Sequence, residues 1–202
     1  MPEIREPQGV VRFTGVVKSW PPGVNEARPA RCVRCGLGAW NGKRLRIHGH
    51  GVSARQQRGP QTPEAPATCD VPAVRRYRCT ACDAVMRVVP ASCVARKHFS
   101  GAAIAQALAL WGLCGLSAPA VRERVNDWRL RGAGARGWRS LQRWATDVAS
   151  GRLFAPLGLG ALPEALREVA QRAAQALCGY APIPWRSAPV DHQAHVGYRH
   201  VS

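Results

Sequence analysis

Two Cys-x-x-Cys pairs are the residues of this chain best suited to chemistry, because four thiolates together can hold a metal ion. Cys32 and Cys35 form the first pair, and Cys79 and Cys82 form the second, with 43 residues between the pairs. A Cys-x-x-Cys turn directs both sulfurs the same way, and Gly36 suits the backbone of such a turn. Two such turns supply the tetrahedral thiolate set that zinc prefers. The spacing therefore predicts a structural zinc site formed by these four cysteines.

Other side chains are candidates for the same ion. His48 and His50 would share one face of a strand, and Cys69 and Cys93 lie near the second pair along the chain. Histidines next to arginines more often face solvent or phosphate, and the sequence leaves open whether His48, His50 or Cys69 join the metal site. A redox dithiol is the alternative interpretation of a Cys-x-x-Cys pair, but it needs a surrounding βαβ pattern, which is not visible here.

Short strands are predicted to position the two turns. Residues 43–51 alternate apolar with basic side chains, and residues 73–79 and 84–90 are rich in β-forming types. Turn, strand, strand, turn, strand is the order of a zinc ribbon. Residues 53–70 are rich in Pro, Gln and Ala without periodicity, which predicts a long exposed loop inserted in the ribbon. The expected first domain covers residues 1–95, and zinc would supply on the order of 10 kcal/mol of its folding free energy.

Helices are predicted after Pro90, where the apolar spacing changes from two to about 3.6 residues. Ser100 is predicted to cap a helix that runs to about Leu113, and Ser117 to cap a second helix after a Gly-containing turn. This layout is typical of helix-turn-helix proteins. The sequence thus predicts an α+β protein. An N-terminal zinc ribbon of short antiparallel strands is followed by an all-α helix-turn-helix bundle over residues 96–180 and a flexible Pro-rich tail over residues 181–202.

Residues 138–150 are predicted to form the helix that reads DNA. The apolar side chains fall on one side of a helical wheel, and the Arg, Gln and Thr side chains fall on the other. Arginine and glutamine suit base edges in the major groove, and hydroxyl groups reach phosphates. An ordinary amphipathic helix with a solvated polar face is the alternative. The predicted DNA contacts are Arg129, Arg131, Arg136, Arg139, Ser140, Gln142, Arg143 and Thr146, with Lys97 and His98 of the basic connector before the helices.

The chain is strongly basic, with 29 basic and 12 acidic side chains and a net charge of +17. This excess favours a polyanionic partner, and nucleic acid is the first candidate. A GC-rich genome would explain why most of the basic residues are arginine, but it does not explain the excess over acids. No apolar run approaches the roughly 18 residues of a membrane span, and the N-terminus shows no signal-peptide apolar region. The expected location is the cytoplasm, in association with the nucleoid.

The stretch "CVRCG…RLRIHGHG…VRRYRCTACDAVMRVVPASCVARKHFS", followed by the helices, resembles a known group of proteins. It is similar to the zinc-finger and helix-turn-helix region of bacterial insertion-sequence transposases, and to small stand-alone proteins encoded near such elements. The resemblance covers about residues 30–150. It implies that the two Cys-x-x-Cys pairs bind zinc and that the helix over residues 138–150 contacts DNA.

Carboxylates that could catalyse strand transfer are scarce in the helical half. The transposases continue into a catalytic domain with three carboxylates, and two-metal chemistry needs such groups clustered. No cluster is visible among the acidic residues after the start of the second predicted helix, which are Glu123, Asp127, Asp147, Glu164, Glu168 and Asp191. The leading hypothesis is therefore a non-enzymatic protein that binds double-stranded DNA, as an end-binding, targeting or regulatory protein of a mobile element.

Three alternatives to duplex DNA binding stay open. RNA would suit the charge equally well, and Trp20, Trp40 or Tyr77 could stack on its bases. An adaptor subunit of a larger transposition or defence complex would use zinc only to fold a docking surface. A nuclease or recombinase fragment would need carboxylates, which are few here.

Overall fold

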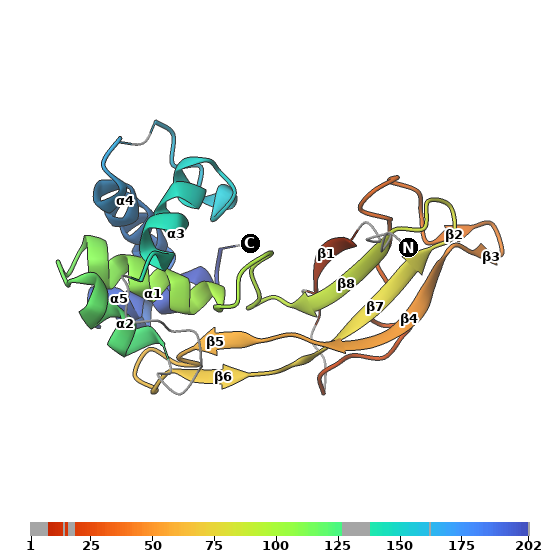
Figure 1. The fold of residues 1–202 in the computed structure, drawn as a ribbon, viewed down its shortest axis with the longest axis horizontal. Coiled ribbons are helices and arrows are strands. Elements are labelled where there is room, and N and C mark those ends of the chain that lie inside the picture. Colours follow the sequence, from red (N-terminus) through yellow and green to blue (C-terminus); the bar gives the residue numbers. More distant parts are fainter. Residues whose placement is uncertain (1–7, 14, 16–18, 127–137, 162, 202) are drawn as a thin grey trace, which may run out of the picture. The chain divides into compact units, whose positions relative to one another are not determined.

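The chain divides into two compact units, which a computed structural model describes at residues 8–13, 15, 19–126, 138–161 and 163–201. The first unit combines Met1–Gln57 with Val71–His98, and the second combines Arg58–Asp70 with Phe99–Ser202. Strands dominate the first unit and helices dominate the second (Figure 1), so the protein is mixed α+β.

A four-stranded sheet forms the centre of the first unit, in the order β1-β8-β7-β4 (Figure 1). Its strands are β1 (Gln8–Phe13), β8 (Val85–Pro90), β7 (Ala73–Cys79) and β4 (Ile47–Ala54). β7 lies antiparallel to both β4 and β8, while β1 adds at the edge, parallel to β8. β7, which ends at the first cysteine of the second pair, is thus held by a hydrogen-bonded ladder on each side.

A second, very short ladder follows the first Cys-x-x-Cys turn. β2 (Trp40–Asn41) pairs antiparallel with β3 (Arg44–Leu45), with Trp40 opposite Leu45. The two-residue connection begins at Gly42, whose φ of +57° lies in the left-handed region that glycine adopts at little cost. This hairpin leads the chain from the first turn into β4.

The core of the first unit lies on one face of the four-stranded sheet. Ile47, Tyr77, Met86 and Val88 are buried there in one cluster with cysteines of both pairs. The Tyr77 hydroxyl donates to the carbonyl oxygen of Val24 at 2.7 Å, and this bond attaches the segment around Val24 to this face of the sheet. The opposite face buries only a smaller cluster at one end, as expected for strands whose side chains alternate.

Residues 58–70 belong to the second unit, so the prediction of an exposed loop there is wrong. β5 (Gln57–Gly59) pairs with β6 (Thr68–Asp70). The Gln106 side chain donates to the carbonyl oxygen of Pro63 at 2.9 Å. Side-chain periodicity does not report contacts made by backbone carbonyls, and the sequence pattern therefore missed this packing.

The second unit contains five α-helices in the described part of the chain: α1 (Gly101–Gly112), α2 (Ala118–Val125), α3 (Ser140–Ala149), α4 (Leu166–Gly179) and α5 (Val190–Tyr198) (Figure 1). Two short 3-10 helices, η1 (Ala155–Leu157) and η2 (Ile183–Trp185), precede α4 and α5. Residues 127–137, between α2 and α3, lie outside the described residues. The helix-turn-helix arrangement and the zinc ribbon stay predictions.

α1 is the central helix, and all its residues from Gly101 to Leu110 are buried. The Ser100 hydroxyl caps it by accepting the Ala103 N–H at 3.1 Å. α2, α3, α4 and α5 all pack against α1. Gly112 allows α4 to come close, because a methyl group at this position would lie 2.5 Å from the backbone nitrogen of Gln171.

The prediction of a flexible tail at residues 181–202 is wrong, because residues 181–201 are folded. α5 packs on α1 and α4, and His195 is fully buried with its Nε2 atom 3.3 Å from the carbonyl oxygen of Pro60. A methyl group on Gly197 would overlap the carbonyl oxygen of Leu177. The last proline of this segment precedes Val190, so the residues that follow can form a short helix.

Candidate metal centre

The four predicted cysteine ligands come together at one end of the first unit. Cys32 Sγ lies 3.6 Å from Cys82 Sγ, and Cys35 Sγ lies 3.8 Å from Cys79 Sγ. All four sulfur atoms lie within 4.8 Å of one another. A tetrahedral zinc site with Zn–S bonds of about 2.3 Å has S···S edges of about 3.8 Å. The cluster is therefore compatible with a metal site, and its size and its donor atoms both suit zinc.

The first turn fixes the Cys32 and Cys35 side chains with backbone hydrogen bonds. The Gly36 N–H donates to the Cys32 carbonyl at 2.9 Å, and the Cys32 N–H donates to the Leu37 carbonyl at 2.9 Å. The Arg34 N–H points at Cys32 Sγ at 3.5 Å. Gly36 has a φ of +71°, so this position favours glycine, as the sequence predicted.

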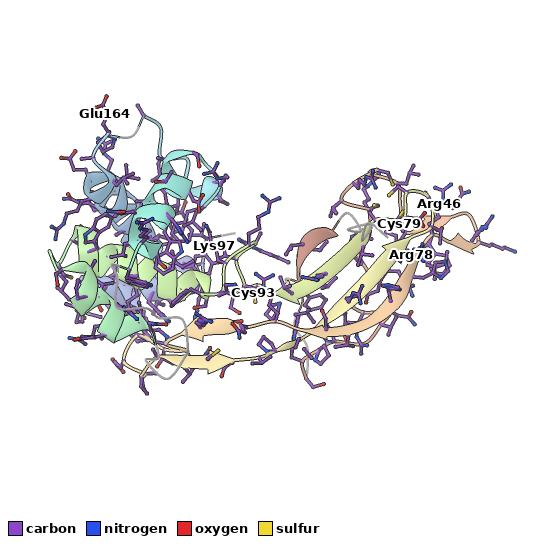
Figure 2. The ribbon with its side chains drawn as sticks, in the orientation of Figure 1. Arg46, Arg78, Cys79, Cys93, Lys97 and Glu164 are labelled. Atoms are coloured by element: carbon purple, nitrogen blue, oxygen red, sulfur yellow. The ribbon has the colours of Figure 1, made fainter. Side chains whose placement is uncertain are left out.

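The second turn repeats the same pattern at the end of β7. The Asp83 N–H donates to the Cys79 carbonyl at 2.8 Å, and the Cys79 N–H donates to the Ala84 carbonyl at 3.0 Å. Asp83 takes the place of the glycine, with a φ of +56°. Its carboxylate lies 3.1 Å from Arg78 in an exposed ion pair. Figure 2 labels Arg78 and Cys79 on β7. Two turns of one geometry therefore face each other with their sulfurs between them.

Two of the four thiols, those of Cys32 and Cys82, have pKa values shifted in opposite directions. Burial alone would raise the pKa of Cys32, but hydrogen bonds from the backbone of Cys35 and Arg34 and from neighbouring sulfurs lower it to about 7. Burial raises the pKa of Cys82 to about 12, and the neighbouring sulfurs add to the increase. Four thiolates this close cannot all form without a counter-charge, since like charges oppose ionisation. A divalent cation would supply that charge.

The competing ligands lie elsewhere. The ring of His48 contacts the Leu45 carbonyl at 3.0 Å and is exposed, and the buried Cys93 Sγ lies 3.2 Å from Gln57 Oε1. Cys69 belongs to the second unit. Within the ranges that the structure describes, no other group of three or more Cys, His, Asp or Glu side chains comes as close together. His48, His50 and Cys69 therefore do not join the four-cysteine cluster.

α3 presents the polar side chains that the sequence assigned to DNA. Its buried face packs on α4 and α1, and Trp144 lies edge-on to Phe99 with ring centroids 5.1 Å apart. Arg139, Gln142, Arg143 and Thr146 are exposed, and Ser140 is half-buried. The Thr146 hydroxyl donates to the Gln142 carbonyl of its own helix at 2.9 Å. The amphipathic pattern is thus observed, whereas contact with DNA stays a prediction.

The remaining predicted DNA contacts belong to the other unit or lie outside the described residues, and they stay predictions. Lys97 and His98 end the first unit, whereas α3 belongs to the second. The Lys97 carbonyl accepts a hydrogen bond from Arg55 at 3.1 Å. Arg129, Arg131 and Arg136 lie outside the described residues.

An arginine-bearing sheet face was not singled out by the sequence. Arg76 on β7 lies directly opposite Arg87 on β8, and Arg78 is two residues further along the same face. The β1–β8 register places Arg12 on this face as well. The alternation within "AVRRYRC" carried the signal, but the strand order that joins these residues is not visible in sequence.

Comparison with protein-family models found no match, and comparisons with curated proteins and with solved structures found none either. None of the helices in the described residues combines the length and apolar character that crossing a membrane requires.

Proposed function

We propose that this protein is a zinc-stabilised, non-enzymatic, sequence-selective binder of double-stranded DNA. The observation that carries the proposal is the exposed face of α3, where Arg139, Gln142 and Arg143 project from a helix whose other side is buried. A helix fits the major groove, and arginine and glutamine can make paired hydrogen bonds to guanine and adenine there. α3 is the recognition helix in this proposal.

The first unit would supply affinity that is independent of sequence. It contains sixteen basic and four acidic side chains, a net charge of +12. The zinc ion would hold β7 and the first turn together, so that the arginine-bearing sheet face is rigid. Arginine contacts to phosphates release counterions, and the affinity should therefore fall steeply as salt is raised.

Association with a bacterial mobile element rests on the resemblance of the Cys-x-x-Cys and arginine-rich stretches alone. In that role the protein would bind element ends, target a larger complex or regulate transcription. RNA binding and service as an adaptor subunit are the competing functions. RNA binding predicts that structured RNA displaces duplex DNA from the protein. An adaptor role predicts that DNA binding is weak and insensitive to salt.

Selection from a random duplex pool at physiological salt tests the proposal. A defined sequence motif should emerge, and Arg139→Ala and Arg143→Ala should each weaken binding to it by about 1–3 kcal/mol without changing the fold. Arg172→Ala is the matched control, because Arg172 is an exposed arginine on α4 whose guanidinium donates to the Ala161 carbonyl at 2.9 Å. If the Arg139/Arg143 double variant binds every sequence as the wild type does, α3 is not the recognition helix.

A further inference from the structure

Trp40 is the largest exposed apolar side chain of the first unit, with 55% of its surface accessible. It lies on β2, whose only partner among the described strands is the two-residue β3, and this hairpin is too short to bury an indole. Single exposed apolar residues are ordinary on protein surfaces, so exposure alone does not mark a site. The surroundings of Trp40 are what set it apart.

Arg28 is held beside the indole ring. Its guanidinium carbon lies 5.7 Å from the ring centroid, within the range of a cation–π contact. Its Nη2 atom donates to Asn25 Oδ1 at 2.8 Å. Its buried Nε–H has no hydrogen-bond partner in the described part of the chain. Arg28 thus contacts both the indole ring and Asn25 at this place.

An open pocket of about 460 Å³ adjoins the ring, and this volume falls within the range of small-molecule sites. Its walls combine the Arg28 and Trp40 side chains with small residues and backbone. The lining residues are Asn25, Arg28, Pro29, Ala30, Gly38, Ala39 and Trp40. A flat ligand could lie against the indole because the adjacent wall at Gly38 and Ala39 carries little side-chain bulk.

The charge around the pocket is positive. Arg31 follows the lining segment directly and pairs across a β-bridge with Gly38, and Lys43 and Arg44 belong to the same hairpin as Trp40. Among the described residues of the first unit, the acidic side chains are Glu26 and Asp83. An aromatic face with Arg28 beside it, and with further basic residues on the adjoining segments, suits a ligand that is both flat and anionic.

We propose that this pocket, which we call the Trp40 pocket, binds one unpaired nucleotide of a single-stranded nucleic acid. The base stacks on the indole, and the neighbouring phosphates contact the Arg and Lys side chains. Bases in a duplex are already stacked on each other, so a duplex cannot present a base in this way. Single-stranded DNA and RNA share the required chemistry. The inference rests on the first unit alone and is independent of α3.

The test measures binding of a fluorescein-labelled oligothymidylate of about 12 nucleotides by anisotropy, with oligouridylate as the RNA arm. Trp40→Leu keeps an apolar side chain but removes the aromatic face, and it should weaken binding of the better ligand about 5- to 150-fold. Trp40→Phe keeps an aromatic face and should retain most of the affinity. Tyr180→Leu is the control, because Tyr180 is an exposed aromatic residue of the second unit, and it should change nothing.

An oligonucleotide whose bases are replaced by abasic sites separates stacking from charge. It keeps the phosphates, so the wild type should bind it as weakly as the Trp40→Leu variant binds the thymidylate. Equal affinity of wild type and Trp40→Leu for thymidylate would overturn the proposal, as would equal affinity of Trp40→Leu and Trp40→Phe. Zinc content and the thermal transition of each variant show that the first unit is intact.

Duplex binding separates this inference from the proposed function. Trp40→Leu should bind the selected duplex as the wild type does, and Arg143→Ala should bind thymidylate as the wild type does. Loss of thymidylate binding in both variants alike would contradict an independent Trp40 pocket. Failure to select any duplex sequence would refute the role of α3 and leave the predicted thymidylate result unchanged.

Discussion

Replacing Gly36 with alanine tests the geometry of the first Cys-x-x-Cys turn. Gly36 has a φ of +71°, and a methyl group there would meet nothing within 4 Å, so the substitution adds backbone strain without a collision. The left-handed region costs a non-glycine residue about 1–2 kcal/mol. Because metal binding and folding of such a unit are coupled, this cost should appear as zinc affinity about 5- to 30-fold weaker.

Competition with a chromogenic chelator, under reducing conditions and at constant pH, measures that affinity. Gly179→Ala is the matched control, because a methyl group at this position at the end of α4 also meets nothing within 4 Å and needs no left-handed φ. Asp83→Gly relieves the equivalent strain in the second turn and should not weaken zinc binding. Unchanged zinc affinity in Gly36→Ala, or an equal loss in Gly179→Ala, would refute the reasoning.

Three further predictions concern the stability of each unit. Gly112→Ala should destabilise the second unit by about 1–3 kcal/mol in urea unfolding, since the added methyl group would lie 2.5 Å from the Gln171 backbone nitrogen. Burial lowers the pKa of His195 to about 4, from the usual 6.5. Between these two values the unfolded chain binds a proton that the folded chain does not. The free energy of unfolding should therefore fall by roughly 3 kcal/mol as the pH drops from about 6.5 towards 4. The fall should be smaller in the His195→Gln variant. A strong chelator, or the Cys79→Ser substitution, should unfold the first unit, while far-UV circular dichroism still shows the helices of the second unit. Loss of the whole helical signal would show that the second unit depends on the metal.

Local patterns in the sequence predicted the parts of the structure that depend on local geometry. The Cys-x-x-Cys spacing specifies each turn within six residues, with Gly36 also marking the first turn, and the two faces of α3 follow from a period of about 3.6. The capping serines Ser100 and Ser117 also begin helices where the sequence placed them. In these cases the interactions that determine the local structure are between residues that are close together in the sequence.

Long-range contacts decided the parts that the sequence did not predict. Residues 58–70 pack against α5 through contacts such as the one between His195 and the Pro60 carbonyl. These two residues are 135 positions apart in the sequence. The Pro-rich composition of these segments suggested an exposed loop and a flexible tail, because composition reflects the conformational entropy of the free chain and not its packing partners. The exposure of Trp40 likewise depends on how little of the fold surrounds β2 and β3.

Residues 58–70 belong to the helical unit although they lie between two segments of the first unit, and this matters for the design of protein fragments. The polypeptide passes from one unit to the other after Gln57, after Asp70 and after His98, so no single cut yields both units whole. A fragment ending at residue 98 would carry thirteen residues deprived of their partners, and a fragment starting at residue 99 would lack the segment that contacts His195. Joining residue 57 to residue 71 through a short glycine-serine bridge is the cleaner way to isolate the cysteine-bearing half.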